Sequence, residues 1–100
     1  MLVKEIMNSS YPSLYEDELA TKARAVLRER NLWVLPIIDE KKRLVGILSR
    51  RNLMSITSSI SPMRVKGIMT NPPFVATMDM DALQALKEMN RFDKWYVAVV

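Results

Sequence analysis

The chain has 100 residues, of which 49% are hydrophobic and 26% are charged, the composition of an ordinary globular domain. It contains no cysteine and no histidine, which excludes disulfide frameworks, thiolate or imidazole metal sites, cysteine nucleophiles and histidine bases. The formal net charge of +4 is spread over both halves and names no particular anionic partner. Because no apolar run approaches a membrane span and the N-terminus lacks a signal pattern, we expect a cytoplasmic protein.

An internal repeat is the most informative feature of the chain. The segment Val3–Met7 (VKEIM) recurs as Val65–Met69 (VKGIM), an offset of 62 residues. The same offset pairs further identical residues: Asp17 with Asp79, Ala20 with Ala82, Ala23 with Ala85 and Trp33 with Trp95. We expect one slip in this alignment, near Pro12 and Pro73. The chain is therefore predicted to hold two copies of one structural unit, in residues 1–60 and 61–100.

The first half of the first copy predicts a turn, a strand and a helix. A single turn is expected at Val3–Met7 and a short strand at Pro12–Tyr15. The acidic cluster Glu16–Glu18 is typical of a helix start, where negative charge meets the positive end of the helix dipole. The helix that follows presents an apolar face, formed by Leu19, Ala20, Ala23, Val26 and Leu27.

The second half of this copy predicts a β-hairpin. Its strands are expected at Trp33–Ile38 and Leu44–Leu48, joined by a charged turn at Asp39–Arg43. Ser49 stands at the position of a helix N-cap and opens a short helix over Arg50–Ser58. A linker is expected at Ser58–Pro62.

The second copy repeats the turn, a strand at Phe74–Thr77 and a helix whose apolar face is formed by Ala82, Leu83, Leu86 and Met89. It reaches Val100 in the strand that should begin its hairpin, before a closing strand and helix. Since an unpaired apolar strand tends to associate, we expect the natural protein to continue or another chain to supply the pairing. The predicted fold class is α/β of the α+β type, a pseudo-twofold pair of short sheets packed by helices.

These residues resemble the CBS domain family, named after cystathionine β-synthase, whose members occur as tandem pairs. The resemblance covers nearly the whole chain and rests on the order of several short motifs. They are Ile6-Met7, Leu35–Asp39 (LPIID) and Gly46–Asn52 (GILSRRN) in the first copy, and Ile68–Thr70 with Val97–Val100 in the second. The chain departs from the family pattern twice, with Asn52 in place of the usual Asp and Ala98 in place of the usual Pro.

The resemblance implies a regulatory module that binds an adenosine-containing ligand, of the AMP, ATP or S-adenosylmethionine class, in the cleft between the copies. The ligand would bias their orientation and so act on a partner. Position by position, the implied ligand-binding residues are Ile47, Ser49, Arg50, Arg51 and Asn52 of the first copy, and Val75, Trp95 and Tyr96 of the second. The resemblance implies no enzyme activity, no metal and no resident cofactor, and we expect a homodimer.

The chemistry of these side chains suits such a ligand. A carboxamide such as that of Asn52 both donates and accepts hydrogen bonds and so matches a ribose diol. Ser49 lies beside the free N–H groups of a helix start, which suit a phosphate. Arg50 and Arg51 add positive charge, but adjacent residues diverge on a helix, so at most one should face the ligand. Val75 and an aromatic ring would line a flat slot for adenine.

Each of these residues also has a structural interpretation. Ser49 is explained equally well as an N-cap worth about 1 kcal/mol. Asn52 is explained as a solvated residue in the first helical turn. Trp33 and Trp95 are better explained as core or inter-repeat packing than as platforms for a base. Tyr96 is explained equally well as a ring that fills the pocket.

Two other functions compete with ligand sensing. One is a scaffold that dimerises without any small ligand. The other is nucleic-acid binding, suggested by the basic clusters Lys41–Arg43 and Arg50–Arg51, although no basic stripe or recognition helix accompanies them. An enzyme is disfavoured because no nucleophile has a recognisable base beside it, and only Gly46 and Gly67 are available for a phosphate loop.

Overall fold

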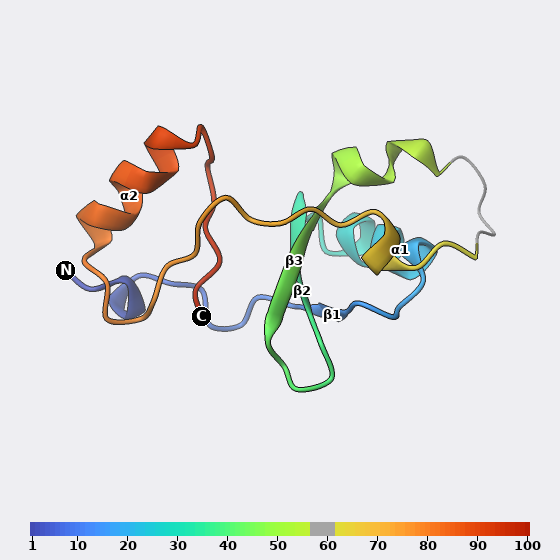
Figure 1. The fold of residues 1–100 in the computed structure, drawn as a ribbon, viewed down its shortest axis with the longest axis horizontal. Coiled ribbons are helices and arrows are strands. Elements are labelled where there is room, and N and C mark those ends of the chain that lie inside the picture. The colour runs from blue at the N-terminus through green and yellow to red at the C-terminus, as the bar shows by residue number, and fades with distance from the viewer. Residues whose placement is uncertain (57–61) are drawn as a thin grey trace. The chain divides into compact units, whose positions relative to one another are not determined.

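A computed structural model describes residues 1–56 and 62–100, apart from the side chain of Ser55. It divides the chain into two compact units, one formed by Pro12–Asn71 and the other by Met1–Tyr11 together with Pro72–Val100. The elements follow in the order η1 (Val3–Glu5), β1 (Leu14–Tyr15), α1 (Ala20–Glu29), β2 (Val34–Ile38), β3 (Leu44–Ser49), η2 (Arg50–Ser55), η3 (Val65–Gly67) and α2 (Ala82–Arg91), where η denotes a 3-10 helix (Figure 1). A small three-stranded sheet together with helices confirms the predicted α/β fold class.

Part of the predicted organisation lies outside the described residues. This applies to the boundary between residues 60 and 61, to most of the Ser58–Pro62 linker and to the end of the helix predicted over Arg50–Ser58. Within the described chain that helix is the 3-10 helix η2, which ends at Ser55.

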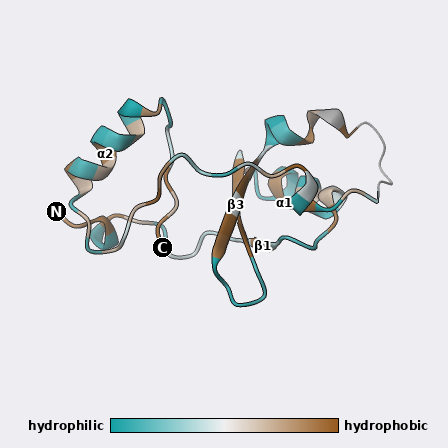
Figure 2. Ribbon diagram, in the orientation of Figure 1, coloured by the Kyte–Doolittle hydropathy of each residue, from teal (hydrophilic) through white to brown (hydrophobic). Residues whose placement is uncertain are grey.

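The unit Pro12–Asn71 is built on a three-stranded sheet in the order β1-β2-β3. Strand β1 pairs in parallel with β2, and β2 pairs antiparallel with β3, which confirms the predicted hairpin. Most residues of both hairpin strands are apolar, and Figure 2 shows this for β3 by its brown colour. Leu35, Ile37 and Leu48 are fully buried, and α1 contributes Ala20, Ala23 and Leu27 to the core. Burial of this continuous apolar surface holds the unit together.

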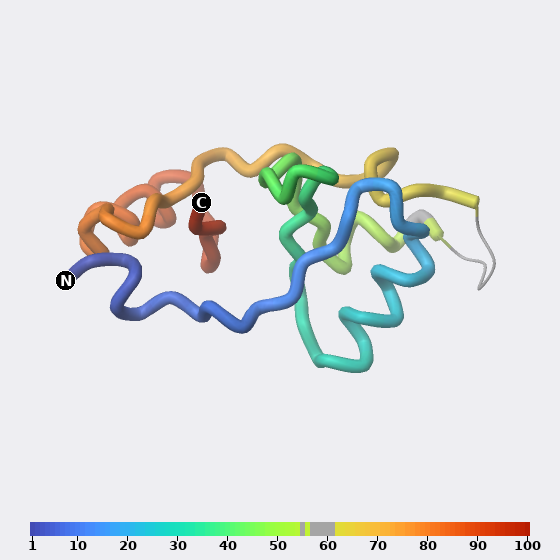
Figure 3. Tube along the Cα trace, turned by 90° about the horizontal axis from the view of Figure 1, so that it is seen from below, coloured from blue at the N-terminus to red at the C-terminus, as the bar shows by residue number. Residues whose placement is uncertain are grey.

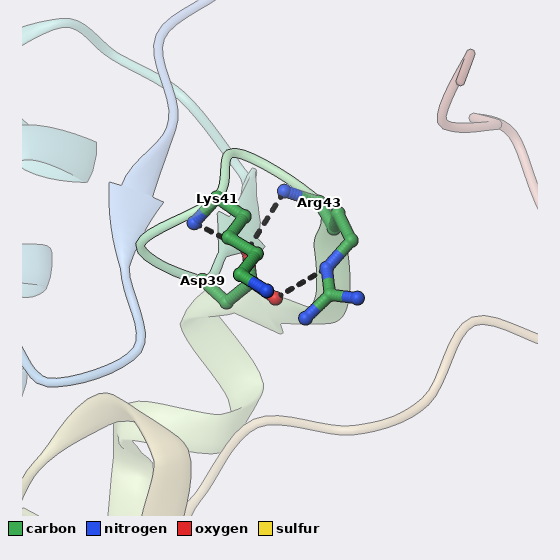
Figure 4. Close-up of polar contacts among 3 residues, drawn as sticks. All are labelled: Asp39, Lys41 and Arg43. Carbon is green, nitrogen blue, oxygen red and sulfur yellow. Dashed lines mark hydrogen bonds and ion pairs between the residues drawn. The ribbon is translucent and has the colours of Figure 1, made fainter.

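The charged hairpin turn is ordered by Asp39 (Figure 4). One carboxylate oxygen of Asp39 accepts hydrogen bonds from the backbone N–H groups of Lys41 and Arg43, both at 2.9 Å. The other accepts one from Arg43 Nε at 2.8 Å. These hydrogen bonds hold the pKa of Asp39 below its usual value of 3.8, and the bond from the Arg43 backbone has the largest effect. Lys42 adopts a φ of 62°, so the turn is a defined structure with a left-handed residue at its tip.

The acidic cluster Glu16–Glu18 does not cap α1 through its side chains. The N-cap is Leu19, which offers no side-chain hydrogen bond, and the N–H of Ala20 donates instead to the backbone oxygen of Met63 at 2.9 Å. Glu18 pairs with Lys22 at 3.2 Å, and Asp17 pairs with Lys66 at 2.9 Å. The cluster precedes the start of α1, as predicted, but two of its three side chains form ion pairs and do not cap the helix.

Two short lead-in segments make equivalent bonds in the two units. Val65 N–H donates to Glu18 O at 2.9 Å in one unit, and Val3 N–H donates to Met80 O at 2.8 Å in the other. Lys66 pairs with Asp17, as Lys4 pairs with Asp79 at 3.6 Å. Each member of these pairs is 62 residues from its counterpart. Figures 1 and 3 show the N-terminal segment beside the chain that precedes α2.

The same offset holds through the segments near Pro12 and Pro73, so the predicted slip in the alignment was wrong. Leu14 pairs in parallel with Ile37, and Ala76 pairs in parallel with Val99, again 62 residues away. The helices α1 and α2 are related by the same offset at both ends. Repetition of backbone pairing at one spacing confirms that the two copies share a local fold.

The second unit has a smaller core, centred on Val3, Ala76 and Ala85. The strand predicted at Phe74–Thr77 is reduced to the isolated bridge at Ala76. Leu83 and Leu86 were predicted on the apolar face of α2, yet their exposed fractions are 57% and 56%. Their counterparts in α1 are Thr21 and Arg24, so these leucines occupy positions outside the buried stripe of the repeat. Neither α1, α2 nor any other helix of residues 1–56 and 62–100 has the length and hydropathy of a membrane span.

Candidate ligand-binding site

Ser49 and Asn52 form a closed turn where β3 ends and η2 begins. The backbone N–H of Asn52 donates to Ser49 Oγ at 3.4 Å, and the backbone N–H of Ser49 donates to Asn52 Oδ1 at 2.8 Å. The Ser49 hydroxyl also lies 3.0 Å from Asn52 Oδ1. This reciprocal arrangement is a capping box with Asn in the place of the usual Glu or Gln, so Ser49 is the N-cap that its position predicted.

The capping box leaves one functional group of Asn52 for other partners. Asn52 Oδ1 accepts two hydrogen bonds from Ser49, whereas the amide nitrogen makes none within the described residues. An amide nitrogen is a donor of two hydrogen bonds. At this position Asn52 can therefore donate to hydroxyl or phosphate oxygens, while its own oxygen orients it.

Arg50 and Arg51 point to different surroundings, as expected for neighbours in a helical turn. The Arg50 guanidinium donates to the backbone oxygen of Leu32 from Nε at 2.6 Å and lies 4.3 Å from the centre of the Trp33 ring. Arg51 is exposed and makes no ion pair or hydrogen bond with the described residues. Of the two, Arg51 holds the charge that remains open to an anion.

Ile47 is buried and fixes the strand that carries Ser49. Its backbone N–H and oxygen pair with Thr70 at 2.8 and 2.9 Å, and the Thr70 hydroxyl donates to the same oxygen at 3.3 Å. Thr70 thus extends the pairing of β3 on the side away from β2. Thr70 belongs to the Ile68–Thr70 motif of the second copy, but no role in the site was predicted for it.

Val75, Trp95 and Tyr96 lie in the other compact unit. The segments that carry them are joined where the N–H of Ala76 donates to Ala98 O at 2.9 Å. The Trp95 and Tyr96 rings meet edge to face, with centroids 5.0 Å apart. Partial burial raises the pKa of the Tyr96 hydroxyl.

The two tryptophans are not core residues. The exposed fractions of Trp33 and Trp95 are 59% and 66%, so packing in a core, one of the two structural interpretations given for them, was wrong. Trp33 stacks against Arg50, whereas Trp95 contacts the Tyr96 ring edge to face and stays exposed. An exposed indole provides a flat apolar surface of the kind that a heterocyclic base can stack on.

Comparison with known proteins identifies the fold family. A model of the CBS domain family matches residues 3–59 and 65–100, which confirms the resemblance seen in the sequence. The homoserine O-acetyltransferase of Methanococcus vannielii is 24% identical over 81 residues, which are 78% of this chain and 16% of that enzyme. The chain spans between about a sixth and a quarter of the length of the curated relatives it matches, so their activities do not transfer to it.

Three solved structures share the fold over essentially the entire chain. The CBS domain pair of protein MJ0100, in complex with 5'-methylthioadenosine and S-adenosyl-L-methionine, has a TM-score of 0.83 at 24% identity, covering 100% of this chain and 80% of that one. The protein CBSX2, in complex with AMP, has a TM-score of 0.86 at 21% identity, covering 99% and 81%. The CBS domain of a bacterial CNNM/CorC family Mg2+ transporter, in complex with ATP, has a TM-score of 0.84 at 25% identity, covering 99% and 72%.

Proposed function

This chain belongs to the CBS domain family, and on that premise we propose that it is a regulatory module that binds an adenosine-containing ligand and has no catalytic activity of its own. Related structures bind ligands of this class, namely S-adenosyl-L-methionine, 5'-methylthioadenosine, AMP and ATP. The observation that carries the proposal is the Ser49–Asn52 turn, which presents an oriented amide donor beside the exposed charge of Arg51.

The proposed roles follow from the groups left open in this turn. The Asn52 amide nitrogen donates to the ribose hydroxyls, and Arg51 pairs with the phosphate. Replacement of the usual Asp by Asn52 removes a charged acceptor for the ribose O–H groups and leaves a neutral donor. We therefore expect Asn52→Asp to tighten binding and Asn52→Ala to weaken it, because a charged hydrogen bond is stronger than a neutral one.

Binding is tested by thermal shift and calorimetry with AMP, ATP and S-adenosylmethionine at millimolar concentrations. A ligand present at ten times its Kd stabilises the folded state by about 1.4 kcal/mol and raises the melting temperature by several degrees. Asn90→Ala, which removes an exposed amide from α2, is the matched control for Asn52→Ala. No heat and no shift with any of the three ligands would refute the proposal.

For the second unit we propose that Val75, Trp95 and Tyr96 contact the adenine. Support comes from the exposed indole of Trp95 and its edge-to-face contact with Tyr96. In a Trp33→Phe protein all indole emission comes from Trp95, so saturation with AMP should quench or shift this emission. Trp95→Phe protein is the control, because its remaining Trp33 should respond far less. Unchanged Trp95 emission at saturating AMP would contradict the contact.

The partners proposed for this module are a second copy of the chain and a regulated protein that responds to the ligand. Exposed Leu83 and Leu86 on α2 support self-association, since adjacent apolar side chains gain by leaving water. Sedimentation equilibrium with and without AMP tests this: a ligand-sensitive dimer is expected. A tight dimer whose association is unchanged by every adenosine ligand would favour the scaffold function.

The cytoplasmic location remains a prediction from the sequence.

A further inference from the structure

Arg50 sits at the C-terminal end of α1 and makes three contacts there. Its Nε donates to Leu32 O at 2.6 Å, its Nη2 donates to Leu27 O at 3.3 Å, and its guanidinium carbon lies 4.3 Å from the centre of the Trp33 ring. In addition, the backbone N–H of Arg50 donates to Trp33 O at 3.1 Å. Main chain and side chain thus tie Arg50 to the same stretch of backbone.

The end of α1 is a favourable place for this cation. The helix closes with Asn31 in the left-handed region at a φ of 52°, and Leu32 N–H returns to Leu27 O at 2.8 Å. The last carbonyl oxygens of a helix carry partial negative charge and lack partners within the helix. Arg50 donates to one carbonyl in the last turns of α1, that of Leu27, and to one in the loop that follows, that of Leu32. Two nitrogens of its guanidinium therefore already have hydrogen-bond partners within the protein.

Arg51, by contrast, has no described partner for its charge. The two arginines are adjacent at the start of η2, directly after the N-cap Ser49. A guanidinium held by two backbone oxygens and a ring would have to break these contacts to reach a phosphate. The exposed guanidinium of Arg51 would have to break no such contacts.

The geometry points to Arg50 as a positioning residue, which clamps the Ser49–Asn52 turn to the end of α1 and does not touch the ligand, while Arg51 meets the phosphate. This inference rests on the proposed adenosine-binding function. It gives the two neighbouring arginines of the motif separate roles, one in shaping the turn and one in charge recognition.

A clamp and a phosphate contact have different signatures in affinity. Loss of the clamp lowers the fraction of molecules with a competent turn, and the apparent Kd of every ligand rises by the inverse of that fraction. If this fraction falls to between about a tenth and a third, the binding of adenosine, AMP and ATP weakens alike by about threefold to tenfold. Loss of a phosphate contact weakens AMP and ATP and leaves adenosine nearly unchanged.

The test measures the Kd of adenosine, AMP and ATP by calorimetry for the wild type, Arg50→Ala and Arg51→Ala. Arg50→Ala should weaken all three ligands by one common factor, and Arg51→Ala should weaken only AMP and ATP. In a Trp95→Phe background without ligand, Arg50→Ala should also shift the Trp33 emission, because the ring loses its cation. Arg50→Lys keeps a positive donor but loses the planar guanidinium, so it should show a smaller common factor; it replaces Arg50→Ala in the test if that variant does not fold.

Two results would overturn this inference and leave the proposed function intact. One is a selective loss of AMP and ATP binding in Arg50→Ala or Arg50→Lys with adenosine unaffected, which would make Arg50 a phosphate contact. The other is an unchanged Kd for all three ligands in the folded Arg50 variants, which would deny it any role in binding. If the wild type binds none of the three, the proposed function and this inference fall together.

Discussion

Gly46 lies in β3 where the side chain of Met69 leaves no room for a Cβ atom. An added Cβ would meet Met69 Sδ at 2.6 Å, Cγ at 2.9 Å and Cβ at 3.3 Å. Overpacking of this kind costs about 1–3 kcal/mol. Alanine recovers about 0.4–1 kcal/mol by restricting the unfolded chain. The midpoints of these two ranges predict that Gly46→Ala destabilises the protein by about 1.3 kcal/mol.

The obstacle is a specific side chain, so its removal should relieve the cost. Met69→Ala takes away the two atoms nearest to the added Cβ, Sδ and Cγ, and keeps the 3.3 Å contact with the Met69 Cβ. In that background Gly46→Ala should cost little, giving a coupling energy of about 1–2 kcal/mol between the two positions.

Urea denaturation followed by circular dichroism, applied to the wild type, both single variants and the double variant, measures this coupling. Equal m-values across the four proteins would validate the comparison. If the two single effects add to within about 0.5 kcal/mol, Met69 is not what excludes a side chain at Gly46, and the reasoning is refuted.

Three further predictions concern the core and the charged turns. Leu27→Ala should lower the free energy of unfolding by about 2–5 kcal/mol because Leu27 is 1% exposed, whereas Met54→Ala should change it by no more than about 0.5 kcal/mol because Met54 is 77% exposed. Similar losses for both variants in thermal denaturation would contradict the burial of Leu27 and the exposure of Met54. Hydrogen bonds lower the pKa of Asp39, so its contribution to stability should be present above pH 3.8 and disappear as the pH falls through the lower folded value. A difference between wild type and Asp39→Asn that persists unchanged to about pH 2 would argue against this. Asp17 raises the pKa of Lys66 above 10.5, so the advantage of wild type over Lys66→Met should hold below pH 10.5 and vanish as the pH rises through the folded pKa. Urea midpoints from neutral pH upward measure it, and a constant advantage would exclude the Asp17 pair as its source.

Local signals in the sequence determined a good part of the fold. The hairpin was predictable because the apolar runs at β2 and β3 flank the charged turn ordered by Asp39. The cap at Ser49 and the lead-in turns were predictable because capping and single turns depend on a few neighbouring residues. The order of several short motifs, together with their repetition, carried the resemblance to the CBS family, and the family match confirms it.

Only the tertiary structure decided which partners the charged and apolar side chains have. The acidic cluster preceding α1 was expected to interact with the positive end of the helix dipole, yet Asp17 pairs with Lys66, 49 residues away. Leu83 and Leu86 followed a helical period but lie outside the buried face, and the direction of the Arg50 side chain depends on carbonyls at the end of α1. Periodicity and capping are local effects, whereas ion pairs, burial and the choice between two adjacent arginines depend on segments that meet only after the chain has folded.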